Sequence, residues 1–354
     1  MPLDSPRRTA PVSFGIVSPG RWGRKLLDAV RASEHLKFAG VFSRDASKRS
    51  EITTAYGGRS FDSFDALLAA PDVEAVLLPT PHFLHHAQAL AALRAGKHVF
   101  VEKPIATSLE QAEEMNRVAK ISGRTLAVGL QGRHTGGIRS LKAKLAAGEL
   151  GEVCSVVVLH GFPHALARSP GDWRADASVS PGGQIDELGV HYFDVLQFLF
   201  GPVRRVTGFI QRRPPHAPPS SATVALEFSS GLVANYTTYD ASVAMSRLTV
   251  LGTRGCLEMN RMGQDACTWQ PVSDATVARL GGHAAVPIQF EGPYLLSTAL
   301  TAELEDFAAA IRENRPPQVG ATEAISTLRI SRAVMEASVT GHTVELSPTS
   351  TESC

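Results

Sequence analysis

The first 130 residues alternate short apolar runs with helical patterns. One helical pattern covers Leu84–Ala95 and stops before Gly96, and another begins at Ser108, where Ser-Leu-Glu-Gln forms a capping box. Strands that alternate with helices build βαβ units, so this region predicts a doubly wound parallel sheet. The apolar runs have the length of strands buried on both faces. They are Val12–Val17, Lys37–Phe42, Ala75–Leu78, His98–Val101 and Thr125–Gly129.

After residue 130 the pattern changes to longer β-rich stretches, which predict a second domain. Prolines and glycines mark loops at Arg212–Pro219 and Gly281–His283. The predicted strands are Glu152–His160, Val203–Gln211, Thr223–Phe228, Leu232–Tyr239 and Arg247–Leu251. The predicted helices are Ile138–Ala147, a segment starting near Ile185, Ala299–Asn314 and Thr322–Val339. We expect a disordered lead-in over residues 1–11, one domain over 12–130 and a second over 131–354.

Charge and composition exclude several classes of protein. Lys and Arg number 35 against 34 Asp and Glu, and this balance argues against nucleic acid or anionic lipid as a partner. The four cysteines show no C-x-x-C spacing, which fits neither a disulfide framework nor a structural zinc site. The apolar run after the N-terminus is too short for a signal peptide, and no run has the roughly 18 apolar residues of a membrane span. The sequence therefore predicts a cytoplasmic protein.

A glycine-containing turn follows the first strand directly. The segment Ser18-Pro19-Gly20-Arg21-Trp22-Gly23 leads into a helix, which is the context of the dinucleotide fingerprint G-x-G-x-x-G. Gly20 takes the place that lets backbone approach a pyrophosphate, and Gly23 the place that lets the helix pack closely on the strand. Ser18 replaces the first glycine, so we expect an altered turn, and an ordinary βα turn stays open as the alternative.

The end of the second strand bears on the choice of cofactor. NAD enzymes place an acidic residue near this point for the ribose 2′-hydroxyl, whereas NADP enzymes place an arginine there for the 2′-phosphate. This chain has Ser43-Arg44-Asp45. Ser43 can hydrogen-bond a phosphate and Arg44 can pair with it through two N–H groups, which favours NADP. Asp45 keeps NAD as the alternative.

Two further strand ends carry functional side chains, because ligands of open parallel sheets bind outside the carboxyl ends of the strands. The third strand runs into Pro79-Thr80-Pro81 and His85, and the fourth into Glu102-Lys103-Pro104. Both segments resemble motifs of the glucose–fructose oxidoreductase, inositol dehydrogenase and MocA (Gfo/Idh/MocA) family.

The resemblance extends over nearly the whole chain. It includes Trp173-Arg174, Pro181-Gly182-Gly183, the run from Glu187 to Asp194, and Leu251-Gly252-Thr253-Arg254-Gly255. It implies an N-terminal Rossmann domain and a C-terminal α/β domain with a large, mainly antiparallel sheet. It also implies an NAD(P)-dependent oxidoreductase that acts on sugars, inositols or related polyols and forms a homodimer or homotetramer.

Hydride transfer at a hydroxyl or keto carbon needs a proton donor or acceptor and a cation near the oxygen. Lys103 can supply the cation, and its family counterpart contacts the substrate oxygen. His191 is the candidate general acid/base, because imidazole titrates near neutral pH. Glu187 lies four residues earlier on the predicted helix and can share a face with His191, whereas Asp186 points elsewhere. A solvated helix end is the alternative for Glu187, His191 and Asp194.

Other candidate residues are assigned to the cofactor site or to the substrate site. Glu102, Lys103 and His85 are predicted to contact the cofactor, His85 by shaping its pocket. Arg133, His164, Trp173 and Arg174 are predicted to line the substrate site, with interdomain packing as the alternative for Trp173. No metal is expected, because neither an H-E-x-x-H pattern nor a cysteine cluster is present.

Together these features predict an NAD(P)-dependent oxidoreductase, with NADP favoured over NAD, that moves hydride to or from a hydroxyl or keto carbon of a sugar-like or other cyclic polyol. The alternative is a non-catalytic dinucleotide- or ligand-sensing regulatory protein of the same fold. The sequence does not specify the substrate or the direction of the reaction, because fold and cofactor site leave the pocket undefined.

Overall fold

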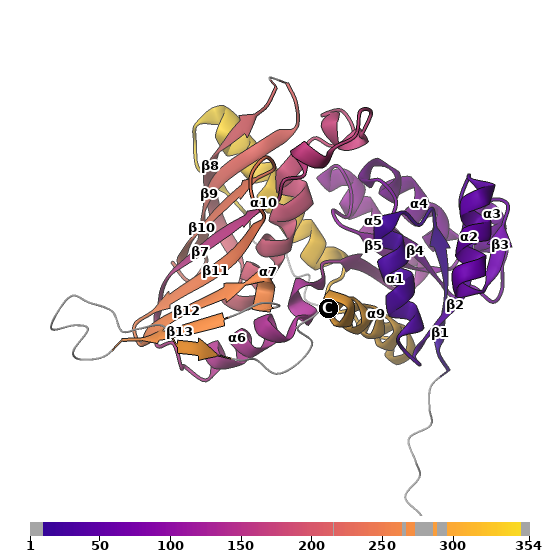
Figure 1. Ribbon diagram of the computed structural model, residues 1–354, viewed down its shortest axis with the longest axis horizontal. Coiled ribbons are helices and arrows are strands. Elements are labelled where there is room, and N and C mark those ends of the chain that lie inside the picture. Colours follow the sequence, from indigo (N-terminus) through magenta and orange to yellow (C-terminus); the bar gives the residue numbers. More distant parts are fainter. Residues whose placement is uncertain (1–9, 215, 264–266, 273–285, 289–295, 348–354) are drawn as a thin grey trace, which may run out of the picture. The chain divides into compact units, whose positions relative to one another are not determined.

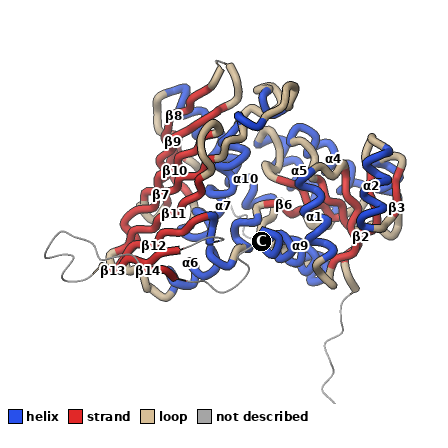
Figure 2. The backbone as a smooth tube through the Cα atoms, in the orientation of Figure 1, coloured by secondary structure: helices blue, strands red, loops and turns tan. Residues whose placement is uncertain are grey.

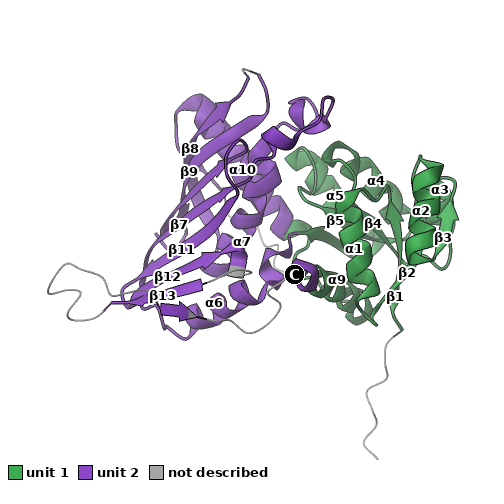
Figure 3. Ribbon diagram, viewed as in Figure 1, with its two compact units in different colours: residues 1–129, 300–322 green, residues 130–299, 323–354 purple. Residues whose placement is uncertain are grey.

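The computed structural model describes residues 10–214, 216–263, 267–272, 286–288 and 296–347 (Figure 1). The chain forms two compact units, residues 1–129 with 300–322 and residues 130–299 with 323–354 (Figure 3). Nearly all of the predicted lead-in and the predicted loop Gly281–His283 lie outside the described residues. Residues 300–322 fall in the first unit, whereas the sequence analysis assigned them to the second domain.

The first unit contains a six-stranded parallel sheet in the order β3-β2-β1-β4-β5-β6. Every residue of β1 and β4 is buried, so both faces of the sheet are covered, as the apolar runs predict. Five of the six strands were predicted, and only the three-residue β3 was missed. The strands are β1 (Val12–Val17), β2 (Leu36–Phe42), β3 (Arg59–Phe61), β4 (Ala75–Leu78), β5 (His98–Glu102) and β6 (Leu126–Gly129).

Side chains cap several helices of this unit. Ser108 Oγ accepts from the N–H of Gln111, as in a capping box. The return bond differs from the usual one: Gln111 Oε1 accepts from the N–H of Thr107, the residue before the N-cap, and not from that of Ser108. Asp45 and Ser63 cap α2 and α3 in the same manner. The helices are α1 (Arg21–Arg31), α2 (Ala46–Tyr56), α3 (Phe64–Ala69), α4 (His82–Arg94) and α5 (Leu109–Ser122).

Helix α9 (Leu296–Glu313) packs on the parallel sheet through Phe307. The Phe307 ring lies 6.0 Å from that of Phe14 in β1 and 5.9 Å from that of Phe100 in β5. Arg312 of the same helix donates two hydrogen bonds to the carboxylate of Glu74. These contacts explain why residues 300–322 belong to the first unit although they follow most of the second unit in the sequence.

The second unit contains a nine-stranded sheet in the order β14-β13-β12-β11-β7-β10-β9-β8-β15. All neighbours are antiparallel except β7 and β10, so the prediction of a large, mainly antiparallel sheet is confirmed. Strands β12 to β15 were not predicted. The strands are β7 (Val153–Gly161), β8 (Val203–Arg212), β9 (Pro219–Phe228), β10 (Val233–Tyr239), β11 (Met245–Gly252), β12 (Gly255–Asn260), β13 (Cys267–Pro271), β14 (Val286–Ile288) and β15 (Val344–Glu345).

Three helices cover one face of this sheet (Figure 2): α6 (Gly136–Ala146), α7 (Val190–Phe200) and α10 (Ala321–Thr340). Ile138, Phe193 and Val334, one from each helix, are fully buried in the same core as Val224 of β9. Short helical turns join these elements: η1 (Gln131–His134), η2 (Ala165–Ala167), η3 (Trp173–Ala175), the π-helical turn η4 (Ile185–Gly189) and η5 (Arg261–Gly263). None of the helices in the described ranges combines the length and apolar character that a membrane span requires.

Candidate active site

The turn after β1 leads through Ser18, Pro19 and Gly20 into α1, which begins at Arg21. Ser18 adopts a φ of 49°, in the left-handed region that favours glycine, and its N–H donates to the carbonyl of Phe42 at 2.7 Å. Ser18 therefore makes the tight turn that the first glycine of the fingerprint usually makes. An altered turn was predicted at Ser18, but its φ lies in the region that a glycine would adopt.

The two remaining fingerprint glycines face different surroundings. A Cβ on Gly23 would lie 2.7 Å from Pro19 Cβ and 3.0 Å from Pro79 Cγ, so this position needs a glycine for close packing. A Cβ on Gly20 would meet nothing within 4 Å. Gly20 precedes Arg21 at the start of α1, and no side chain caps this helix. An open glycine beside an uncapped helix N-terminus fits a pyrophosphate, so the turn fits a bound dinucleotide.

Trp22 links this turn to the end of β5. Its indole Nε1–H donates to Glu102 Oε1 at 2.5 Å. A Cβ on Gly129 in the neighbouring strand would lie 2.8 Å from the same oxygen, so Gly129 leaves room for the carboxylate. Burial raises the pKa of Glu102 to about 7, although the Trp22 hydrogen bond and the charge of Lys103 act to lower this pKa.

The end of β2 presents Ser43 and Arg44. Ser43 is buried, and Arg44 is exposed. Asp45 Oδ1 accepts from the N–H groups of Ser47 and Lys48 and from the Ser47 hydroxyl, which caps α2 and holds the pKa of Asp45 below its usual range. This use of Asp45 as a helix cap weighs against its predicted alternative role as a ribose-binding acid.

His85 ties together two of the predicted strand-end segments. Its Nδ1 lies 2.9 Å from the carbonyl oxygen of Pro104, and its Nε2 lies 2.8 Å from that of Thr80. The ring is fully buried, and burial lowers its pKa to about 4. The peptide between Lys103 and Pro104 is cis. His85 thus contacts the backbone directly after Lys103, while Pro81 is the N-cap residue before α4.

In the second unit, two glycines shape the entry to α7. A Cβ on Gly182 would lie 2.1 Å from the Asp186 carboxylate, and Gly183 has a φ of 45°. Asp186 accepts from the Ser331 hydroxyl and pairs with Arg332 at 2.7 Å, so it points away from Glu187, as predicted. The turn that carries Glu187 is a π turn, wider than the α-helix on which the predicted spacing was based.

Glu187 lies near two arginines and a histidine. His164 Nδ1 and Arg174 Nε are each 3.6 Å from its carboxylate, and Arg168 Nη2 is 3.9 Å away. Arg168 also lies 3.6 Å from Asp240, at the end of β10. The structure thus brings together the predicted Glu187, Arg174 and His164, and it adds two residues that the sequence analysis missed, Arg168 and Asp240.

Arg133 is engaged elsewhere. Its Nε donates to both oxygens of Asp194 at 2.9 and 2.8 Å, and its Nη2 lies 2.7 Å from Oδ1. Asp194 is fully buried, and burial raises its pKa to about 6 despite this partner. The pair joins η1 to α7. The guanidinium of Arg133 is therefore used in a structural ion pair.

Three more predicted site residues lie in η3 and α7. Arg174 stacks on the Trp173 ring, with its Cζ 4.4 Å from the ring centroid. His191 is buried in the first turn of α7. Among the described residues, no group of three or more His, Cys, Asp or Glu side chains is arranged to hold a metal ion.

Family models match both units. A model of the oxidoreductase family with an NAD-binding Rossmann fold matches residues 12–130, and a model of the GFO/IDH/MocA C-terminal domain matches residues 138–258. The chain belongs to the Gfo/Idh/MocA family. It is therefore an NAD(P)-dependent oxidoreductase, and no comparison supports the regulatory alternative.

Two named relatives align along almost the whole chain. The 1,5-anhydro-D-fructose reductase of Ensifer adhaerens is 28% identical and covers 94% of this chain and 98% of its own. The D-xylose 1-dehydrogenase (NADP(+)) 2 of Haloferax volcanii is also 28% identical, with 94% and 99% covered. The structure of an aldose-aldose oxidoreductase from Caulobacter crescentus superposes with a TM-score of 0.84 at 26% identity, covering 95% and 100%.

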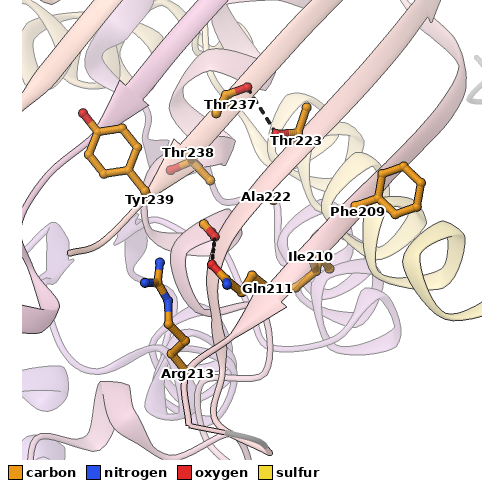
Figure 4. Close-up of a pocket in the computed structure, with 10 residues that line it drawn as sticks. Phe209, Ile210, Gln211, Arg213, Ala222, Thr223, Thr237, Thr238 and Tyr239 are labelled. Carbon is orange, nitrogen blue, oxygen red and sulfur yellow. Dashed lines mark hydrogen bonds between the residues drawn. The ribbon is translucent and has the colours of Figure 1, made fainter. Parts of the chain in front are cut away.

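A separate hollow of about 330 Å³ lies along β8, β9 and β10 of this Gfo/Idh/MocA chain (Figure 4). Hydrogen bonds between Thr223 and Thr237 and between Ser221 and Gln211 link adjacent strands there. The hollow contains none of the predicted site residues.

Proposed function

We propose that this enzyme uses NADP(H) and transfers hydride to or from a hydroxyl or keto carbon of a sugar or other cyclic polyol. The observation that carries the cofactor choice is the end of β2, where Arg44 is exposed while Asp45 caps α2. An exposed guanidinium suits a 2′-phosphate, and a carboxylate occupied as a cap is less suited to a ribose hydroxyl. The names of the two aligned enzymes support a sugar substrate.

In this proposal the residues of the first unit bind the cofactor. Ser18, Gly20, Arg21 and Gly23 form the pyrophosphate turn, while Ser43 and Arg44 contact the 2′-phosphate. The segment Pro79–Pro81 and residues His85 and Glu102 shape the nicotinamide end. When bound, the nicotinamide dinucleotide supplies the hydride chemistry.

The proton chemistry belongs to Lys103, His191 and Glu187. Lys103 stabilises negative charge on the substrate oxygen, and His191 passes a proton to or from it. Glu187 orients the substrate or the imidazole, and Trp173 and Arg174 line the substrate site. Arg133 acts on this site indirectly in the proposal, by holding Asp194 in α7. We further propose that the enzyme is cytoplasmic and works as a homodimer or homotetramer.

The cofactor proposal is tested by fluorescence titration of nucleotide-free protein with NADPH and NADH. Trp22 is one of the three tryptophans and lies in the pyrophosphate turn, so it can report binding. Arg44→Ala should weaken NADPH binding about 10-fold and NADH binding much less, because one charge-assisted contact is lost. Lys37→Ala, at the opposite end of β2, is the matched control. Equal losses for the two nucleotides would refute the 2′-phosphate role.

A further inference from the structure

Arg168 holds an unusual position in the second unit. It follows the turn η2 in the long loop between β7 and α7, and its side chain is only 18% exposed. One end of the guanidinium faces Glu187 and the other faces Asp240, at 3.9 and 3.6 Å. Both carboxylates are buried, with residue exposures of 5% and 3%. Arg168 is therefore shared between two buried acids.

The side chains around Glu187 and Asp240 lie 3.6 to 3.9 Å from the carboxylate oxygens, and Arg174 Nη1 also donates to Asp172 Oδ1 at 3.4 Å. His164 and Arg174 approach Glu187 no closer than 3.6 Å, beyond ordinary hydrogen-bond distance. The Nε of Arg168 is buried without a hydrogen-bond partner in the protein. Arg168 is thus paired by charge with both acids, while its Nε–H stays available to a ligand.

Gln184 gives a second, independent observation at the same place. It directly precedes η4 and is fully buried. Its Nε2 donates to the carbonyl of Tyr239, the residue before Asp240, at 3.0 Å, which places the amide beside the cluster. Its Oε1 is buried with no hydrogen-bond partner in the protein. Buried amide oxygens are normally satisfied, so this acceptor indicates a ligand group that can donate.

The balance of charge indicates the chemistry of that ligand. Arg168, Arg174 and Arg213 act on Glu187, Asp240 and Asp172, so the three arginines are matched by three carboxylates. A phosphate or carboxylate would be repelled by two buried acids. A hydroxyl both donates and accepts, so it can bond to a guanidinium and a carboxylate together. Neighbouring hydroxyls of an uncharged polyol therefore fit the cluster.

We propose that Arg168 and Asp240 form a substrate-binding pair that selects uncharged polyols against phosphorylated or carboxylated ones. The inference rests on the proposed function and specifies its substrate class. Arg168 donates to a substrate hydroxyl and Asp240 accepts from a neighbouring one. Asp240 also keeps the charge of the cluster balanced, which excludes anionic sugars.

The test compares initial rates with matched substrates in the full-length enzyme with cofactor. The panel contains D-glucose and myo-inositol as uncharged members and D-glucose 6-phosphate and D-glucuronate as anionic ones. We expect the wild type to prefer uncharged members. Arg168→Gln should raise their KM about 10-fold with a smaller effect on kcat, because one charge-assisted hydrogen bond is lost. Asp240→Asn should raise kcat/KM for anionic members relative to uncharged ones about 10-fold, because a repelling charge is removed.

Two controls keep the result interpretable. Arg247→Gln makes the same change on β11 of the same sheet and should leave all rates near wild type. Arg168→Lys keeps the charge and loses the planar fork, so its KM for uncharged substrates should lie between those of the wild type and Arg168→Gln. If Arg168→Gln folds poorly, a raised KM in Arg168→Lys still tests the contact.

The outcomes separate this inference from the proposed function. Preference for anionic sugars, or a KM unchanged in both Arg168 variants, would overturn the inference while the proposed function stands. Absence of turnover with every sugar, in protein that binds dinucleotide, would overturn the proposed function and the inference with it.

Discussion

The indole of Trp22 and the carboxylate of Glu102 form a hydrogen bond of 2.5 Å between residues 80 positions apart in the chain. Trp22 lies in the pyrophosphate turn, and Glu102 directly precedes Lys103. The bond therefore connects the segment proposed to hold the cofactor with the segment proposed to stabilise the substrate oxygen. Because the carboxylate is buried, this link is sensitive to the protonation of Glu102.

Glu102 should make the free energy of unfolding depend on pH. Its pKa in the folded protein is about 7, above the ordinary value of 4.5, so the folded state keeps a proton that the unfolded state loses. The resulting stabilisation is complete below pH 4.5 and is lost as the pH rises to about 7, by about 3 kcal/mol. Glu102→Gln keeps an acceptor for Trp22 and cannot ionise. Urea unfolding at pH 5 and pH 8 should show this loss in the wild type relative to the variant.

Trp22→Phe provides the matching control for the hydrogen bond. The Trp22 bond lowers the pKa of Glu102, so its removal should raise that pKa and move the stability change to higher pH. A pH dependence identical in all three proteins would contradict the assignment to Glu102.

Ser18→Gly should stabilise the first unit. A non-glycine residue in the left-handed region costs about 1 kcal/mol, and Ser18 has a φ of 49°. The variant should gain part of this free energy of unfolding, because glycine also raises the conformational entropy of the unfolded chain. Chemical denaturation monitored by tryptophan fluorescence measures the change. A loss of stability would mean that the Ser18 side chain contributes more than its backbone strain costs.

His85→Ala should destabilise the enzyme and lower turnover, because the neutral imidazole donates its one N–H to the carbonyl of either Thr80 or Pro104, next to Lys103. We expect a loss of about 2 kcal/mol in the free energy of unfolding, as is typical for a buried polar contact. The pKa of His85 is lowered from 6.5 to about 4, so its contribution is present above pH 6.5 and is lost as the pH falls toward 4. Comparison of wild type and variant at pH 7 and pH 5 should show a smaller difference at pH 5.

Phe307→Ala should unfold the first unit more readily than the second. Phe307 is fully buried against Phe14 and Phe100, and removing such a ring costs about 3–5 kcal/mol. Hydrogen exchange should show faster exchange in β1 and β5, while β9 and β10 change little. Equal effects in the two sheets would contradict the assignment of residues 300–322 to the first unit.

The sequence predicted the parallel sheet well because its strands are buried on both faces and are separated by helices. Strands β1 and β4 have their predicted bounds. The three-residue β3 was missed, because Arg59–Phe61 is too short to show a pattern. Strand β12 was missed although its buried positions Gly255, Leu257 and Met259 alternate, because the glycine gives no apolar signal. The sequence of α9 does not reveal that this helix packs on the first sheet, because Phe307 contacts Phe14 and Phe100, which are far from it in the chain.

The site was predicted in part, and the missed residues depend on tertiary contacts. Lys103, His191 and Glu187 were found through family motifs, and their catalytic roles stay predictions. Arg168 lies in a loop without periodicity, so no local pattern distinguishes it from a solvated arginine. Asp240 offers a weak signal, an acidic residue directly after a strand. Asp45 and Arg133 were candidates for ligand contacts because of their residue types. In the structure Asp45 caps α2, and Arg133 pairs with Asp194.

Lys103→Met should lower kcat at least about 100-fold, because a group that stabilises charge on the reacting oxygen is lost. The affinity for NADPH should stay near that of the wild type, since the pyrophosphate turn and the end of β2 are unchanged. A variant with unchanged turnover would remove Lys103 from the mechanism.

Single-turnover oxidation of bound NADPH tests the central claim most directly. Nucleotide-free enzyme is loaded with one equivalent of NADPH and mixed with a panel of uncharged keto-sugars, and the absorbance of the reduced nicotinamide is followed. At least one ketone should oxidise the cofactor in the wild type, and the reaction should be at least about 100-fold slower in Lys103→Met. Firm binding of NADPH with no oxidation by any member of the panel would contradict it.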